Sequence, residues 1–193
     1  MLKHLNEYHI LLGSGSPRRK ELLSGLGIDF KVAVLPDVDE SYPSHLKGEE
    51  IPLYIARKKA KAYFSNMDKD TLLITADTIV WLENRVYGKP KTAADAVVML
   101  TALSGKTHKV ITGTVVCSLE KETAFTVTSE VRFAHLSEEE IRYYVEKYHP
   151  LDKAGAYGVQ EWIGYIGVEY IEGSYYNIMG LPVQRLYKEL KKF

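Results

Sequence analysis

The stretch Ser14-Gly15-Ser16-Pro17-Arg18-Arg19-Lys20-Glu21-Leu22-Leu23 decides how the rest of the chain is interpreted. The apolar run at 8–12 leads into it and predicts a short buried strand. Ser16 stands where a helix N-cap belongs, and Pro17 takes the first helical position, where its missing N–H costs nothing. Gly25 follows about two turns later and predicts the helix end. The order strand, glycine-serine turn, helix indicates an α/β protein.

This turn has the features of a phosphate site. Backbone N–H groups at a helix N-terminus point at anions, and Arg18 and Arg19 add positive charge beside them. Two adjacent arginines on a first helical turn are unfavourable against the helix dipole unless an anion is present. A simple capped turn is the alternative. Gly13-x-Gly15 lacks the third glycine of a dinucleotide fingerprint, and no Gly-Lys-Ser/Thr forms a Walker A loop.

Composition limits the class of protein. The chain has 193 residues, 46% hydrophobic and 26% charged, which is ordinary for a globular protein. A formal net charge of zero gives no support for a nucleic-acid polymer as partner. A lone cysteine, Cys117, excludes an internal disulfide, suits the reducing cytoplasm and is predicted to be a buried small hydrophobe. No apolar run approaches the length of a membrane span, and the first residues lack a secretory core.

Strand and helix patterns mix along the chain, which predicts a mixed sheet flanked by helices. We expect residues 1–193 to form one domain, with two lobes around a central cleft as a further possibility. Strands are expected at 29–35, at 72–76 continuing through 78–82, at 108–119 and 123–135 as an antiparallel hairpin, and as a strand pair within 162–176. Helices are expected at 49–64, 92–103, 137–148 and 181–193.

Asp77 is the first candidate for chemistry. It directly follows the apolar run 72–76, and the end of a buried strand is a common place for ligand-facing residues. A hard cation such as Mg²⁺ is held by one or two carboxylates plus substrate phosphates. An acidic loop supplies further candidates in Asp37, Asp39 and Glu40. The plain alternatives are a turn residue for Asp77 and a solvated surface for the loop.

Two lysines are candidates for charge stabilisation, because phosphoryl chemistry needs cations around the transferred group. Lys59 lies on a basic helix face and would ordinarily be solvated surface. Lys89 is less easily dismissed, because Gly88 and Pro90 restrict the backbone around it.

Other chemistry-bearing residues favour structural roles. His108 and His135 lie in strand-like runs without zinc spacing, so we interpret them as structural or surface residues. The tyrosine-rich region 165–176 is interpreted as core, with a nucleobase contact as the alternative.

Several ordered motifs carry a resemblance to a known family. They are Ser14–Leu23, Ala76-Asp77-Thr78-Ile79-Val80, Gly88-Lys89-Pro90, Leu103–Thr112, Asp152–Gln160, Gly173–Tyr176 and Met179–Pro182. Together, over roughly Ile10 to Leu186, they resemble the Maf family of nucleoside triphosphate pyrophosphatases. The resemblance implies a Maf/Ham1-like fold with a cleft between two lobes.

The resemblance also implies an activity. It implies a cytoplasmic house-cleaning hydrolase that converts a nucleoside triphosphate to the monophosphate and pyrophosphate with a divalent cation, Mg²⁺ or Mn²⁺. The family also suggests a homodimer. By this analogy Asp77 activates water, and Asp77 and Glu40 together hold the metal. Lys59 and Lys89 would neutralise the phosphate chain, and Ser14 and Arg19 would contact phosphates.

The run Lys-Ala-Gly-Ala-Tyr-Gly-x-Gln at 153–160 is similar to the subgroup acting on dTTP and UTP. Its selectivity positions match Arg18, Thr78 and Gln160, and an amide can pair with both an imide N–H and a carbonyl of thymine or uracil. Two alternatives stay open: the same chemistry on 7-methyl-GTP, and a regulator of cell division that binds triphosphates without turnover.

Three departures from the family pattern are visible. Gly13 stands where alanine is usual, and Thr75 stands where glycine is usual. Within the acidic loop, Glu40 and Asp39 are interchangeable as the second carboxylate.

Overall fold

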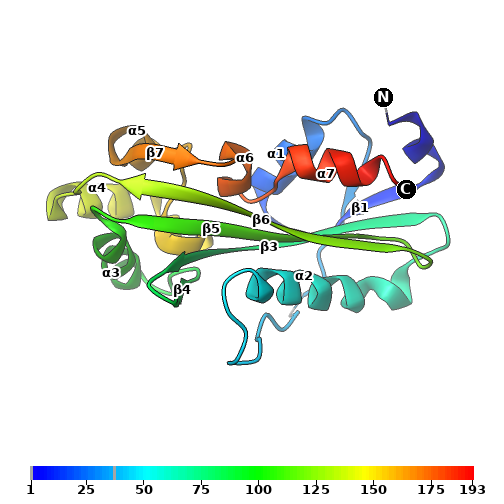
Figure 1. Cartoon of the computed structure of the whole chain (residues 1–193), viewed down its shortest axis with the longest axis horizontal. Helices are drawn as coiled ribbons and strands as arrows, with labels where there is room; N and C mark the ends of the chain where they lie inside the picture. Colours follow the sequence, from blue (N-terminus) through cyan, green and yellow to red (C-terminus); the bar gives the residue numbers. More distant parts are fainter. Residues whose placement is uncertain (1, 37) are drawn as a thin grey trace. The chain divides into compact units, whose positions relative to one another are not determined.

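A computed structural model describes residues 2–36 and 38–193, and Figure 1 labels its helices and strands. The strands are β1 (His9–Leu12), β2 (Lys31–Val32), β3 (Thr71–Leu82), β4 (Arg85–Tyr87), β5 (Thr107–Cys117), β6 (Glu122–Phe133) and β7 (Val168–Glu172). The α-helices are α1 (Pro17–Ser24), α2 (Glu50–Tyr63), α3 (Ala93–Leu103), α4 (Glu138–Tyr148), α5 (Trp162–Gly167), α6 (Tyr175–Ile178) and α7 (Val183–Leu190). Short 3₁₀ helices are η1 (Lys3–Glu7), η2 (Phe64–Asn66), η3 (Pro150–Asp152) and η4 (Ala154–Ala156).

The strands form one mixed sheet. Its order is β2-β1-β3-β5-β6-β7, with β4 paired to β3. β1 runs parallel to β2 and to β3, whereas β4 on β3 and β7 on β6 are antiparallel. The predicted α/β fold, a mixed sheet flanked by helices, is confirmed. None of the helices in the described part of the chain is long and apolar enough to cross a bilayer.

Helix starts follow the capping residues of the sequence. The Ser16 hydroxyl accepts a hydrogen bond from the Arg19 backbone N–H at the start of α1. α3 and α4 each begin with a reciprocal capping box, formed by Thr92 with Asp95 and by Ser137 with Glu140. These predicted helix starts are therefore confirmed.

The strand pair predicted within 162–176 is wrong. This region forms α5, the single strand β7 and α6. Gly164 admits the first helix, because a Cβ there would lie 1.9 Å from the Val159 carbonyl oxygen. Ser174 caps the second by accepting a hydrogen bond from the Asn177 N–H. Local capping and close backbone approach thus override the β propensity of the aromatics.

The tyrosines of this region also correct the sequence interpretation. Tyr165 is 83% exposed, and Tyr170, Tyr175 and Tyr176 are 40–51% exposed, so they are surface and not core. The rings of Tyr175 and Tyr176 meet edge to face, and the guanidinium of Arg132 lies over the ring of Tyr170.

The strand predicted at 29–35 shortens to β2 because a side chain captures the following backbone. The Tyr63 hydroxyl donates to the Ala33 carbonyl at 2.8 Å and accepts from the Leu35 N–H at 3.2 Å. The Ala33 N–H still donates to the Leu12 carbonyl of β1 at 3.0 Å, and beyond that bond the Tyr63 hydroxyl ties the backbone to the end of α2.

The chain divides into two compact units. The first comprises Met1–Asp77, Thr112–Val127 and Gly180–Phe193, and the second comprises Thr78–Ile111 and Thr128–Met179. The cleft between two lobes stays a prediction.

The core of the first unit forms where α2 packs on β3 and β5. Its buried residues are Ala56, Ala60, Tyr63, Met67, Leu73, Val115 and Cys117. Burial raises the pKa of the Cys117 thiol to about 12, which fits the predicted role of a buried small hydrophobe.

Gly113 of β5 fixes how closely α2 approaches the sheet. A Cβ at this position would lie 2.4 Å from the Leu53 nitrogen and 2.5 Å from the Pro52 carbonyl carbon, both backbone atoms of α2. We expect Gly113→Ala to destabilise the protein by about 3 kcal/mol, at the upper end of overpacking effects, because a helix backbone cannot yield as a side chain can. Urea unfolding measures this difference. Gly88→Ala is the control, since its Cβ meets nothing within 4 Å, and an equal loss in both variants would contradict the packing argument.

The second unit has its own buried centre. α3 and α4 pack together, and the hydroxyl of Ser104, directly after α3, accepts from the N–H of Leu136, just before α4, at 2.7 Å. His108 is buried, contacts the Tyr157 hydroxyl at 2.8 Å and meets the Phe133 ring edge-on. Burial lowers the pKa of His108 to about 4, so the ring is neutral and structural, as expected. His135 is exposed.

Candidate active site

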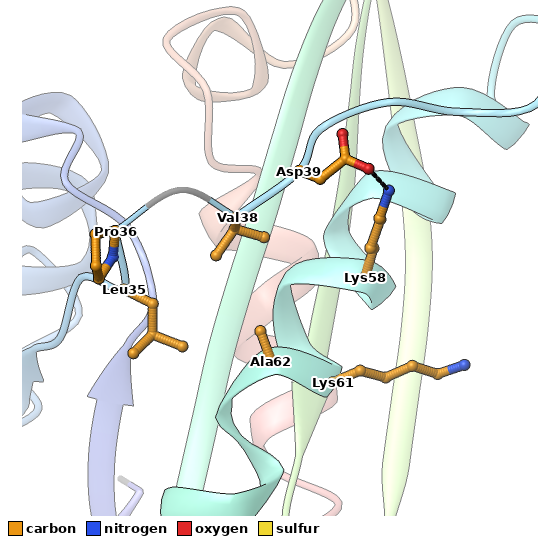
Figure 2. Close-up of a pocket in the computed structure, with 7 residues that line it drawn as sticks. All are labelled: Leu35, Pro36, Val38, Asp39, Lys58, Lys61 and Ala62. Carbon is orange, nitrogen blue, oxygen red and sulfur yellow. Dashed lines mark hydrogen bonds and ion pairs between the residues drawn. The ribbon is translucent and has the colours of Figure 1, made fainter.

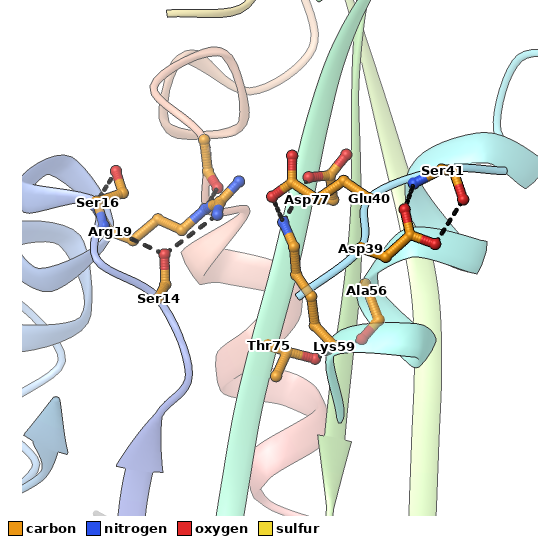
Figure 3. A network of polar contacts seen from close by, with 11 residues as sticks. Ser14, Ser16, Arg19, Asp39, Glu40, Ser41, Ala56, Lys59, Thr75 and Asp77 are labelled. Atoms are coloured by element: carbon orange, nitrogen blue, oxygen red, sulfur yellow. Dashed lines mark hydrogen bonds and ion pairs between the residues drawn. The ribbon is translucent and has the colours of Figure 1, made fainter. Parts of the chain in front are cut away.

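The turn between β1 and α1 is organised around Arg19 (Figure 3). The Ser14 hydroxyl accepts from the Ser16 N–H at 3.3 Å and from Arg19 Nη1 at 3.2 Å. Arg19 Nε donates to the Gly180 carbonyl at 2.8 Å. The guanidinium is therefore held by Ser14, near the start of the chain, and by Gly180, near its end. The N–H groups at the capped start of α1 lie beside it.

Arg19 is electrostatically coupled to two carboxylates. Burial lowers its pKa, Asp77 and Glu40 raise it, and neighbouring Arg18 lowers it. A guanidinium stays protonated at any physiological pH. The turn predicted to bind phosphate thus carries a fixed positive charge within reach of Asp77 and Glu40.

Asp77 lies in the interior of β3, which corrects the expectation of a strand end. β3 continues to Leu82, and Asp77 is only 8% exposed in an otherwise apolar strand. A carboxylate this buried requires a partner. Lys59 of α2 supplies one, with its Nζ 2.8 Å from Asp77 Oδ1.

Lys59 joins a second carboxylate to the first. Its Nζ also lies 2.8 Å from Glu40 Oε1, and its side chain is only 13% exposed. Lys59 is therefore not the solvated surface lysine that its position on a basic helix face suggested. Figure 3 shows Glu40 and Asp77 converging on this ammonium.

The acidic loop separates its carboxylates. Asp39 pairs with Lys58 at 2.5 Å and accepts from Ser41, and these contacts hold its pKa well below the usual range. Glu40, not Asp39, is the loop carboxylate that meets Lys59. Asp37 lies outside the described residues.

A pocket lies between this loop and α2 (Figure 2). Its lining comprises Leu35, Pro36, Val38, Asp39, Lys58, Lys61 and Ala62. Its polar wall is the Asp39–Lys58 pair. Two residues of α2 hold the chain that precedes Glu40. The Tyr63 hydroxyl binds the backbone at 33–35, and Lys58 pairs with Asp39.

Lys89, Thr78 and Gln160 belong to the second unit, and their approach to Asp77 stays a prediction. Thr78 is the half-buried residue after Asp77 in β3, and Lys89 is exposed after β4. The Gly88 carbonyl accepts from the Gly155 N–H at 3.0 Å, so the Gly88-Lys89-Pro90 motif contacts the 152–160 motif. Gln160 Oε1 is buried and has no hydrogen-bond partner within the described residues.

An ion network centred on a buried lysine lies beside Gln160 and is not predicted from the sequence. Lys153, only 8% exposed, contacts Asp152 at 2.8 Å and Glu161 at 3.1 Å. The Tyr144 hydroxyl donates to Glu161 and accepts from the Gly158 N–H at 3.0 Å. Its signal in the sequence is a lysine inside a glycine-punctuated motif, a pattern that carries the family resemblance but does not by itself predict a buried ammonium.

The donor set around Asp77 suits a hard divalent cation. Glu40 and Asp77 offer carboxylate oxygens, the ligands that Mg²⁺ and Mn²⁺ prefer. The residues that the structure describes contain no group of three or more histidine, cysteine, aspartate or glutamate ligands. The pattern fits a metal held by one or two carboxylates and completed by substrate phosphates, not a closed protein cage.

Residues 9–193 match the Maf family of Maf-like proteins, and the chain belongs to this family. Among its curated relatives, the dTTP/UTP pyrophosphatase of Bacteroides thetaiotaomicron is 64% identical over 192 residues, covering all of both chains. The dTTP/UTP pyrophosphatase of Parabacteroides distasonis is 60% identical over 193 residues, again covering both chains fully. That of Porphyromonas gingivalis W83 is 55% identical over 195 residues, 100% of this chain and 98% of the relative.

Solved structures show a more distant likeness. The Staphylococcus aureus Ham1 protein is 18% identical with a TM-score of 0.49, over 82% of this chain and 90% of that chain. A HAM1 protein from Coxiella burnetii is 16% identical with a TM-score of 0.45, over 67% of this chain and 74% of that chain.

Proposed function

We propose that this Maf-family chain is a nucleoside triphosphate pyrophosphatase that hydrolyses dTTP and UTP to the monophosphate and pyrophosphate. The observation that carries the chemistry is the buried Asp77, paired through Lys59 with Glu40 and electrostatically coupled to Arg19. The base specificity is supported by the full-length relatives named dTTP/UTP pyrophosphatase.

Asp77 is the general base in this proposal. Its ionised carboxylate can only accept hydrogen bonds, and it takes a proton from a water that attacks the α-phosphorus. A bond forms between the water oxygen and the α-phosphorus, and the bond from that phosphorus to the α–β bridging oxygen breaks. The bridging oxygen keeps the electron pair and leaves as part of pyrophosphate.

Cationic side chains stabilise the charge that develops on the phosphates. Arg19, held by Ser14 and Gly180, and the N–H groups at the start of α1 face the phosphate chain. Lys59 and, from the second unit, Lys89 add the ammonium groups, and Arg18 reinforces the turn. Glu40 and Asp77 would hold a Mg²⁺ or Mn²⁺ ion, which when bound neutralises the negative charge of the polyphosphate.

Gln160 reads the base in this proposal. Its buried Oε1 has no partner within the described residues and accepts the imide N–H that thymine and uracil share, while its amide N–H₂ donates to a ring carbonyl. Thr78 and Arg18 are the other proposed selectivity residues. A guanine base also presents a ring N–H beside a carbonyl, so the preference for dTTP and UTP over 7-methyl-GTP is supported by the full-length relatives named dTTP/UTP pyrophosphatase and not by this amide alone. We further propose a cytoplasmic location and a homodimer, with no nucleic-acid polymer or membrane as partner.

A substrate panel tests the proposal. With Mg²⁺ present, we expect pyrophosphate and monophosphate from dTTP and UTP, with kcat/KM for 7-methyl-GTP and the purine triphosphates lower by about a hundredfold or more, because a two-ring base with other groups beside its ring N–H leaves buried polar groups mispaired. Release of orthophosphate instead of pyrophosphate would exclude attack at the α-phosphorus. Tight dTTP binding without any product would favour the regulator of cell division over the enzyme.

A further inference from the structure

Thr75 lies where three elements of the candidate site meet. It is fully buried in β3, two residues before Asp77. Its hydroxyl donates to the Ala56 carbonyl of α2 at 2.8 Å, and Figure 3 shows the two residues beside Lys59. Its methyl group faces the phosphate turn, since a Cβ on Gly13 would lie 2.9 Å from Thr75 Cγ2.

This hydrogen bond runs alongside the contact between Lys59 and Asp77. Residues two apart in a strand share a face, so Thr75 and Asp77 point the same way from β3. Residues three apart on a helix are neighbours on its surface, so Ala56 and Lys59 lie next to each other on α2. The 75–56 contact and the 77–59 contact are therefore adjacent links between the same strand and the same helix.

We propose that the Thr75 hydroxyl is a positioning group that sets α2 against β3 and thereby holds Lys59 on Asp77. The lysine side chain has four rotatable bonds and cannot fix its own placement, so the register of its helix must be fixed by something rigid. A buried hydroxyl bonded to a helix carbonyl supplies that link, one turn from Lys59 and one strand repeat from Asp77. The kinetic test of this inference rests on the proposed function, because it measures turnover of dTTP.

Two substitutions separate the hydroxyl from the methyl group. Thr75→Val keeps the shape and the β-branch but removes the donor, whereas Thr75→Ser keeps the donor and removes the methyl. We expect Thr75→Val to lower kcat for dTTP about tenfold with KM within about twofold, because small misplacements of catalytic groups cost up to about a hundredfold. Thr75→Ser should retain kcat within about threefold of the parent, even where its Tm falls.

A matched control comes from the neighbouring strand. Thr114 of β5 is equally buried, and its hydroxyl has no hydrogen-bond partner within the described residues. Thr114→Val should therefore leave kcat and KM as they are in the parent. A similar kcat loss in Thr114→Val and Thr75→Val, or full kcat in Thr75→Val, would overturn the proposal.

A double-mutant cycle distinguishes positioning from general destabilisation. If Thr75 acts through Lys59, Thr75→Val should cause no further loss of kcat in a Lys59→Met background. Additive losses in the double variant would overturn the role.

If the parent releases no pyrophosphate, the proposed function fails, and crystal structures then decide the positioning role alone. Loss of the 2.8 Å Lys59–Asp77 contact in Thr75→Val supports it, and an unchanged contact overturns it.

Discussion

Asp77→Asn should fold like the parent and lose about a hundredfold or more in kcat for dTTP, which is the range expected when a general base is removed. Asparagine has the same shape and can still accept from Lys59, but an amide cannot take a proton from water. Lys59 keeps its contact with Glu40, so no isolated buried ammonium results. Pyrophosphate release at saturating dTTP and Mg²⁺ measures the turnover, and thermal unfolding measures the fold.

Asp70→Asn is the matched control. Asp70 is exposed and precedes β3, where its backbone carbonyl accepts from the His9 N–H at 2.7 Å, and the same substitution there leaves that contact in place. The control should turn over dTTP at the parental rate. Asp77→Asn with parental kcat would remove Asp77 from the role of base, and a collapsed Tm would overturn the expectation that this variant folds like the parent.

The parts of the fold that the sequence predicts are those determined by neighbouring residues. Ser16, Thr92 and Ser137 cap their helices because each N–H that they satisfy lies three residues ahead. The buried strand at Asp77 and the turn holding Arg19 are predictable for the same reason. Glycine, proline and hydroxyl residues act locally, and local rules suffice for them.

The parts that the sequence does not predict depend on residues far apart in the chain. The basic helix face around Lys59 predicts a solvated lysine, whereas the structure places Glu40 and Asp77 beside it. The 162–176 region is different: Gly164 and Ser174 give it helical turns through the nearby Val159 and Asn177, but its strand-like composition hides these local signals.

Gly13 and Thr75, the two small residues that depart from the family pattern, also make a contact that the sequence does not predict. Gly13 and Thr75 look unrelated in the sequence, yet a Cβ on Gly13 would lie 2.9 Å from Thr75 Cγ2. Gly13 therefore accommodates the methyl group of Thr75, and only the packed structure shows that the two positions constrain each other. Pattern matching finds which residues the site contains, and packing decides how they are held.

Lys59→Met should reduce kcat for dTTP by about a hundredfold or more, as expected when a preorganised charge is removed from a site that stabilises developing negative charge. Methionine keeps much of the buried stem but leaves Asp77 and Glu40 facing each other without their shared ammonium. Removing one partner from a buried ion pair costs about 3 kcal/mol or more, so a fall in Tm should accompany the loss of turnover. Steady-state kinetics and thermal unfolding on the same preparation measure both effects.

Two further lysine variants show whether the loss of turnover in Lys59→Met comes from the missing charge or from the loss of stability. Lys61→Met removes an exposed ammonium from the same helix and should change neither kcat nor Tm appreciably. Lys59→Arg retains the charge but replaces a compact ammonium by a wider planar fork, and we expect it to recover stability more than turnover. If Lys59→Arg instead recovered turnover fully, charge alone would suffice at this position. Full activity in Lys59→Met would mean that the ammonium neutralises Asp77 and Glu40 only to keep them folded, and the cations acting on the phosphates would then be Arg19 and its neighbours in the turn.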